Sequence, residues 1–177
     1  YLSTYFPINP KLNPMQLYPL AVGNSWTYKM KDGNTYTNSI TGLEGQHYIM
    51  LNSASNIASK VYADGNNYMT NAYNPDQFQP FLKEGAAVND TWEIHFTANG
   101  IQSILVMTVR EINSSIEVEG KTYSQVLLLE AESKMNMNGT IMSLNFITKY
   151  YYAAGTGLVL TTSSYGDYHG LIDCQLK

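Results

Sequence analysis

Apolar and polar residues alternate in short segments along most of the chain. Residues 25–31 place Trp26 and Tyr28 on one side and polar residues on the other, and Asp32-Gly33 follows. A period of two is typical of a β-strand with one buried face, and Asp-Gly between two such segments is a strong hairpin signal. We therefore predict that residues 25–31 and 35–41 form the first β-hairpin.

The same pattern, interrupted by glycine-containing turns, continues to the end of the chain. The further predicted strands cover residues 46–53, 57–63, 67–72, 91–97, 101–111, 116–118, 123–134, 140–152, 157–163 and 171–176. Strands joined by short turns pair antiparallel, and a long meander must curl or close. We predict an all-β fold, an antiparallel meander of ten to twelve strands that forms a barrel, a half-barrel or a two-layer sandwich.

Proline is concentrated at the N-terminus, where residues 1–20 hold four of the six in the chain. Proline fixes φ and cannot donate a hydrogen bond to a sheet. We therefore expect an extended Pro-rich arm at 1–20, ahead of a single all-β domain at 21–177. The chain starts at Tyr1 without a basic or apolar leader, so we expect a mature or trimmed form.

Residues 73–90 hold the two remaining prolines and lack a strand pattern. They are the longest predicted internal loop, with room for a short helical turn around 78–83. A strand that begins with tryptophan after a glycine turn occurs both before and after this loop. Two meander halves, 21–72 and 91–177, joined by loop 73–90, are one interpretation, and a coincidental match is the other.

Charged residues are scarce and limit the possible functions. They make up 14% of the chain against 44% hydrophobic residues, which excludes a disordered chain. A net charge of −4 with a single arginine argues against a nucleic-acid partner. The absence of a run of about 18 apolar residues argues against a membrane-spanning helix. A neutral polar surface with many tyrosines is typical of an extracytoplasmic β-protein.

Three stretches carry further motifs: LAVGNSWTY at 20–28, IEVEGKTYSQVL at 116–127 and YYAAGTGLVL at 151–160. Together they resemble a family of uncharacterised bacterial cell-envelope lipoproteins with Gly-x-x-Trp-x-Tyr and Tyr-Tyr-Ala-x-Gly-x-Gly-Leu-Val motifs. The resemblance implies a β-domain exported to the periplasm or cell surface, with no established activity. It also implies membrane contact only through a lipid anchor on a cysteine that this chain does not contain.

Two carboxylate–imidazole pairs are the candidates for catalysis. Glu93 and His95 share one face of a predicted strand, and Asp167 and His169 have the same spacing. Brought together, the four could form a metal site or an acid–base pair, which makes a metal-dependent hydrolase the alternative function. As separate pairs they are ordinary outward polar residues. No nucleophile elbow is present, and the single Cys174 forms no intrachain disulfide. We predict no enzymatic activity and no cofactor.

Tyrosine supplies the candidates for binding, which are Tyr62, Tyr68, Tyr123, Tyr150, Tyr151 and Tyr152. A β-barrel can hold a small apolar ligand between its walls, and tyrosine rings also stack on sugars or protein partners. The same rings could instead fill the core. We expect a non-enzymatic domain that binds a hydrophobic or glycan ligand or an envelope protein. A purely structural or immunity-type interaction module is a further alternative.

Overall fold

The structure, a computed structural model, describes residues 16–177 and contains twelve β-strands. They are β1 (Ser25–Met30), β2 (Thr35–Glu44), β3 (His47–Asn52), β4 (Ile57–Asp64), β5 (Asn67–Thr70), β6 (Gln79–Lys83), β7 (Thr91–Ala98), β8 (Ile101–Val118), β9 (Lys121–Met137), β10 (Thr140–Ala153), β11 (Gly157–Ser163) and β12 (Tyr168–Gln175). The described part of the chain holds no helix of the length and apolarity that a membrane crossing requires.

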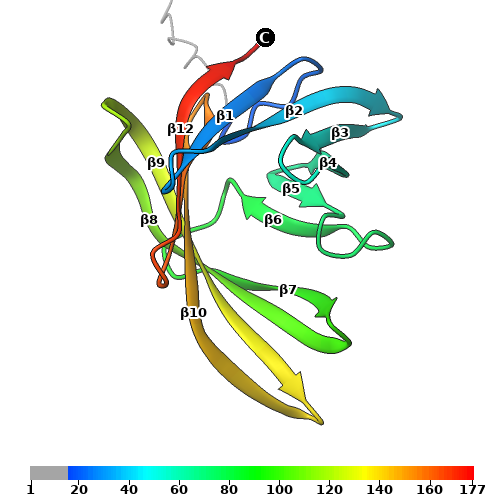
Figure 1. Ribbon diagram of the computed structural model, residues 1–177. Helices are drawn as coiled ribbons and strands as arrows, with labels where there is room; N and C mark the ends of the chain where they lie inside the picture. The colour runs from blue at the N-terminus through cyan, green and yellow to red at the C-terminus, as the bar shows by residue number, and fades with distance from the viewer. Residues whose placement is uncertain (1–15) are drawn as a thin grey trace, which may run out of the picture.

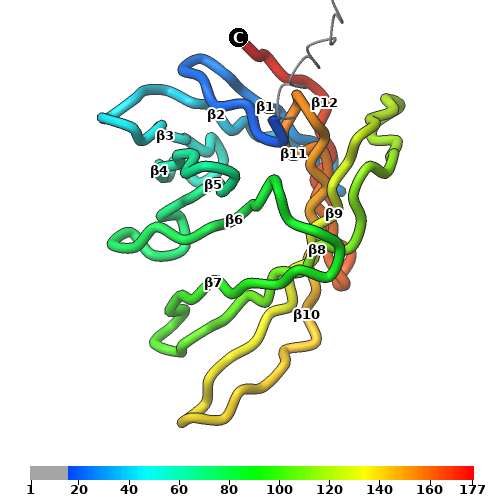
Figure 2. Tube along the Cα trace, turned by 180° about the vertical axis from the view of Figure 1, so that it is seen from behind, coloured from blue at the N-terminus to red at the C-terminus, as the bar shows by residue number. Residues whose placement is uncertain are grey.

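All twelve strands belong to one antiparallel sheet. Its order is β6-β5-β4-β3-β2-β1-β12-β11-β10-β9-β8-β7, so two six-stranded meanders meet where β1 pairs with β12. The sheet curls until β6 lies beside β7, which gives a nearly closed barrel (Figures 1 and 2). The predicted all-β antiparallel meander is confirmed, and of the three predicted architectures the barrel is the one observed.

The expected helical turn at 78–83 is wrong, because this segment forms strand β6. Gln79 and Leu82 point into the barrel and are buried, and β6 pairs antiparallel with β5. Pro80 lies opposite Met69 at an irregularity in this pairing. A proline is tolerated there because β6 is an end strand of the sheet and does not need every backbone donor.

The seam between β6 and β7 is closed by a side chain. The Gln79 carboxamide donates from Nε2 to the His95 carbonyl at 2.7 Å and accepts from the His95 backbone N–H at 2.7 Å. The carboxamide therefore bonds to both backbone groups of His95, the N–H and the C=O, as the backbone of a neighbouring strand would. The Trp92 indole also crosses the seam and donates to the Pro80 carbonyl at 2.9 Å.

Gln79→Met is expected to lower the free energy of unfolding by about 2 kcal/mol, because it keeps the shape of the side chain and leaves both His95 backbone groups without their partner. Urea unfolding gives this value, and hydrogen exchange at the His95 amide should become faster. Gln77→Met, at an exposed position two residues before β6, is the control and should be neutral. Equal stability of the two variants would show that the seam does not depend on this carboxamide.

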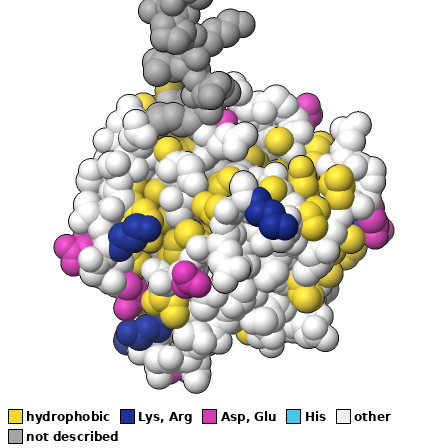
Figure 3. Space-filling view, turned by 90° about the horizontal axis from the view of Figure 1, so that it is seen from above, with side chains coloured by type: hydrophobic (Ala, Val, Ile, Leu, Met, Phe, Trp, Pro, Cys, Tyr) yellow, Lys and Arg dark blue, Asp and Glu magenta, His cyan; other side chains and the backbone are white. Residues whose placement is uncertain are grey.

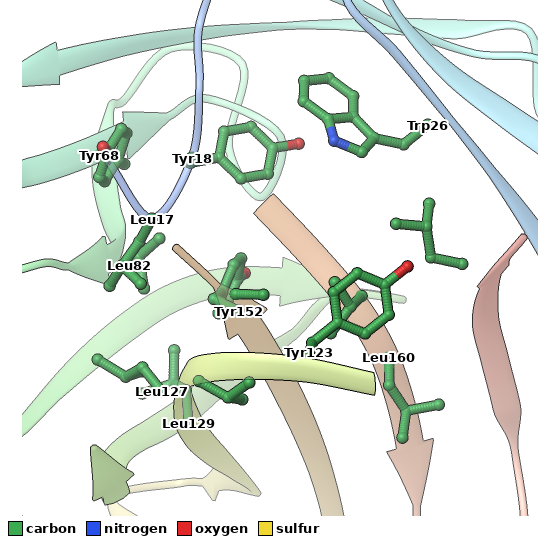
Figure 4. Close-up of a cluster of buried hydrophobic side chains, with 14 of the residues drawn as sticks. Leu17, Tyr18, Trp26, Tyr68, Leu82, Tyr123, Leu127, Leu129, Tyr152 and Leu160 are labelled. Atoms are coloured by element: carbon green, nitrogen blue, oxygen red, sulfur yellow. The ribbon is translucent and has the colours of Figure 1, made fainter. Parts of the chain in front are cut away.

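The core fills the barrel with aromatic and aliphatic side chains from both meanders (Figure 4). The end of the Pro-rich arm is part of it, since Leu17 and Tyr18 are buried. The Tyr18 ring stacks on Trp26 at 5.2 Å and meets the edges of Tyr68 and Phe81. The hydrophobic core thus begins before the expected domain start at residue 21. The rest of the expected arm, residues 1–15, lies outside the described residues.

A buried asparagine ties the two ends of the described chain together. Asn24 is fully buried; its amide donates to the Pro19 carbonyl at 3.0 Å, and its Oδ1 accepts from the Lys177 backbone N–H at 2.9 Å. Its polar atoms are thereby paired, as burial requires. Pro19 and Lys177 are consequently held at the same end of the barrel.

Candidate functional site

A pocket of about 370 Å³ lies where the loop between β6 and β7 faces a bend in β8 and β9. Its lining residues are Leu17, Asn66, Glu84, Gly85, Ala86, Ile112, Asn113, Gln125 and Leu127. An apolar floor with a few polar groups around it, at this volume, is characteristic of small-molecule sites. The pocket is therefore the candidate functional site.

The floor is formed by the inserted arm and by β9. Leu17 and Leu127 are both buried, and both line the pocket (Figure 4 labels them within the core). The Glu84 carboxylate accepts a hydrogen bond from the Leu17 backbone N–H, which holds the arm against the loop that follows β6. The Tyr68 hydroxyl lies 3.5 Å from the same carboxylate oxygen. The position of the floor therefore depends on residues far apart in the sequence.

The rim is formed where β8 and β9 bend. Asn113 and Gln125 both have left-handed backbone conformations, with φ of 54° and 52°, and the β8–β9 register shifts on both sides of Ser114. Such conformations are costly for residues other than glycine and persist where surrounding contacts impose them. Here Ser114 Oγ donates to the Val126 carbonyl at 3.2 Å, and the Ala154 backbone N–H donates to the Gln125 carbonyl at 3.2 Å.

Contacts at the tip of the β8–β9 hairpin also hold the bend in place. At the tip of the β8–β9 hairpin, Glu119 pairs with Lys29 at 3.2 Å and accepts from the Tyr168 hydroxyl at 3.0 Å. These hydrogen bonds lower the pKa of the Glu119 carboxyl. Tyr28 points into the barrel, so its neighbour Lys29 on β1 points outward. Because Glu119 pairs with Lys29, the tip of the β8–β9 hairpin lies on the outer side of the barrel. Tyr123, on β9 close to this tip, belongs to the buried hydrophobic core.

The pocket is lined mainly by apolar and uncharged polar side chains, with one carboxylate. Ile112 is 45% exposed and lies at the mouth of the pocket, whereas Leu17 and Leu127 form its buried floor. The amides of Asn66, Asn113 and Gln125 provide uncharged donors and acceptors. Glu84 is the one ionisable group in the lining, and one of its oxygens is occupied by the arm. The arrangement suits an apolar group that carries a neutral polar end.

The six candidate tyrosines do not converge on one place. Tyr68 and Tyr152 are buried around Tyr18, and Tyr123 is also buried in the hydrophobic core. Tyr62 packs with His47 and Phe78, at 5.0 and 5.1 Å between ring centres. The other two lie partly buried on adjacent residues of β10, Tyr150 and Tyr151, and so face opposite sides of the sheet. None of the six lines the pocket.

A hydrogen-bonded tyrosine–histidine pair lies on the inner side of the barrel wall, apart from the pocket. The Tyr36 hydroxyl is 2.8 Å from His169 Nδ1, and the Tyr36 ring stacks on Tyr28 at 5.4 Å. Burial is the larger cause, and the neighbouring Tyr150 the smaller cause, of a rise in the pKa of Tyr36 to about 12. Burial also raises the pKa of Tyr73, which packs against Phe96. These hydroxyls are neutral at physiological pH and serve as hydrogen-bonding groups.

The two carboxylate–imidazole pairs are not brought together. Glu93 and His95 form an exposed pair at 2.8 Å on β7. His169 points into the barrel from β12, while Asp167, directly before β12, accepts from Ser163 Oγ. Strands β8 to β11 lie between β7 and β12 in the sheet. Within residues 16–177, no group of three or more His, Cys, Asp or Glu side chains is arranged to hold a metal ion.

None of the lining residues of the pocket is among the candidates predicted from the sequence. The one available signal was the break between the predicted strands 101–111 and 116–118, which the structure shows to be the bend within the continuous strand β8. Asparagine tolerates a left-handed backbone, so Asn113 in this break is compatible with a bulge. The other lining residues come from segments that only the folded barrel brings together.

Comparisons with known proteins identify the fold. No protein-family model matches the chain, and no curated protein matches it by sequence. A candidate exported protein with a YmcC-like fold, from Bacteroides fragilis, has a TM-score of 0.54 at 8% identity, over 89% of this chain and 98% of its own. A candidate lipoprotein from Parabacteroides distasonis has a TM-score of 0.50 at 13% identity, over 90% and 98%. The hypothetical lipoprotein YmcC of Escherichia coli has a TM-score of 0.47 at 10% identity, over 92% and 89%.

Proposed function

We propose that this chain is a non-enzymatic, extracytoplasmic β-barrel domain that binds a small uncharged amphiphile in the pocket beside Leu17. The fold supports the location, because the solved structures that share it are described as exported or lipoprotein candidates. The surface supports it too, since uncharged side chains cover most of the face in Figure 3 and the few charges are scattered. The separation of the two carboxylate–imidazole pairs supports a role without catalysis.

The apolar floor with its amide rim is the observation that carries the proposal. Leu17 and Leu127 offer contact to a hydrocarbon group that enters past Ile112. Burying such a group stabilises the complex by about 25 cal/mol for each Å² of apolar area. A polar end would then meet Asn113 and Gln125. The Glu84 carboxylate disfavours an anionic end, so a monoacylglycerol or a long-chain alcohol fits better than a fatty acid.

Ala86→Trp is expected to weaken binding of N-phenyl-1-naphthylamine, a neutral apolar fluorophore, at least about tenfold, since an indole at this position fills the pocket. Fluorescence titration measures the dissociation constant, and displacement by a monoacylglycerol tests the ligand class. Ala87→Trp, at the exposed neighbouring position outside the lining, is the matched control and should bind like the parent. Absence of saturable binding in the parent, or equal affinity in the two variants, would contradict the proposal.

A further inference from the structure

One stretch of β10 has a strand neighbour on a single side. Strand β10 pairs with β9 from Thr140 to Ala153 but with β11 only from Thr148 onward. The backbone of Ile147 is satisfied by Ser164, through bonds of 2.8 and 3.1 Å. The part from Thr140 to Phe146 therefore has no strand on its second edge within residues 16–177. Figures 1 and 2 show this end of β9 and β10 projecting beyond the barrel.

The free edge carries exposed apolar side chains and no charge. Ile141 and Met142 are each about half exposed, and Leu144 is exposed as well. No charged residue occurs from 135 to 148. Soluble proteins usually protect free edges with lysine, proline or inward charges, because an unprotected edge pairs with another strand. This edge has none of those three protections.

The turn at the end of β10 determines which backbone groups face the free edge. Asn138 and Gly139 both have positive φ, and Met137 pairs with Thr140 across them, which defines a two-residue hairpin loop. The pair that flanks such a loop is hydrogen-bonded, and bonded and non-bonded pairs then alternate. Ile141 and Ser143 occupy non-bonded positions relative to β9. Their N–H and C=O groups therefore point towards the free edge.

We propose that two copies of this chain pair through the free edges of their β10 strands, antiparallel about a two-fold axis at Met142. In this register Ile141 of each copy exchanges backbone hydrogen bonds with Ser143 of the other copy. Identical strands are self-complementary only in an antiparallel arrangement, and two-fold dimers are the commonest oligomers. No charged side chain lies within the paired stretch itself, so the strand pairing places no like charges directly opposite each other.

The length of the paired segment is limited by the strand itself. The β9–β10 register shifts between Ser143 and Phe146, and Asn145 has a φ of 52°. This bulge turns the backbone away after Ser143, so strand pairing ends there. Each copy has one such edge on β10. Once this edge is paired with a second copy, no free β10 edge remains for a third copy. The expected assembly is therefore a closed dimer and not a filament.

Sedimentation velocity of the full chain over a range of concentrations tests the assembly. We expect a monomer–dimer equilibrium in the parent, and Ile141→Lys should raise the dimer dissociation constant at least about tenfold by placing two positive charges at the axis. Ile57→Lys, at a 66% exposed apolar position on β4, should leave the equilibrium unchanged. A parent that is monomeric at all concentrations, or a dimer that Ile141→Lys does not weaken, would overturn the proposal.

A cross-link tests the register. In a Cys174→Ser background, Met142→Cys places two thiols opposite each other at the axis, and mild oxidation should give a disulfide-linked dimer. Leu43→Cys in the same background is an exposed control on β2 and should cross-link far less. Equal cross-linking in the two variants would reject the register. Binding of N-phenyl-1-naphthylamine should be unchanged in Ile141→Lys, so this proposal and the pocket proposal fail independently.

Discussion

Trp26→Ala is expected to lower the free energy of unfolding by about 4 kcal/mol, the largest effect of a single substitution in this barrel. Trp26 is fully buried, its ring stacks on Tyr18, and its Nε1 donates to the Thr156 carbonyl at 2.6 Å. The indole contacts residues at the start of the first meander and in the second, so alanine would remove contacts to both. It would also leave a cavity beside Gly157, whose backbone lies against the indole. Chemical unfolding monitored by circular dichroism measures the loss.

Two further variants separate the causes of this loss. Trp26→Phe keeps an aromatic ring and loses the hydrogen bond, so a smaller loss is expected. Trp92→Ala should cost about half as much as Trp26→Ala, because Trp92 is only partly buried, with Lys83 over its ring at 4.9 Å. In the sequence both tryptophans occupy the same kind of position, near the start of a strand that follows a glycine turn. Equal losses for both alanine variants would contradict the difference in burial.

Tyr18→Ala is expected to lower the free energy of unfolding by about 3 kcal/mol, although residue 18 precedes the first strand. The ring of Tyr18 is 8% exposed and contacts Trp26, Tyr68, Phe81 and Tyr152. Its removal takes the central ring out of an aromatic cluster. Thermal and urea unfolding both measure the effect.

Tyr18→Phe is the matched control for this experiment, because it keeps the ring contacts and should stay within about 1 kcal/mol of the parent. An alanine variant as stable as the parent would mean that the arm rests on the barrel without contributing to its core. The pocket offers a second readout, since its floor includes the adjacent Leu17. We expect Tyr18→Ala to weaken binding of the neutral fluorophore as well.

Strands could be predicted from the sequence because their signal is local. Alternation around Trp26 and the Asp32-Gly33 turn are read within a few residues, and the structure has β1 and β2 where this pattern predicts them. Strand β6 was missed because Pro80 and a run without alternation hide it. Its identity as a strand depends on β5 and on Gln79 bridging to β7, which are contacts between distant segments.

The candidate pocket could not be predicted for the same reason. Its floor and rim come from the arm, the loop after β6 and the bend of β8 and β9, and no local pattern connects Leu17 with Gln125. The tyrosines stand out in the composition, yet Tyr68 and Tyr152 are buried core residues. Aromatic content by itself does not distinguish a ring that fills a barrel from one that meets a ligand.

The bonds of Asn24 to Pro19 and Lys177 hold residue 19 and the last residue of the chain at the same end of the barrel. One pole of the barrel therefore carries both ends of residues 16–177. The projecting β9–β10 hairpin lies at the opposite pole (Figure 1). The uncharged strand edge thus lies far from both ends of the described chain, where neither end obstructs the approach of a second copy.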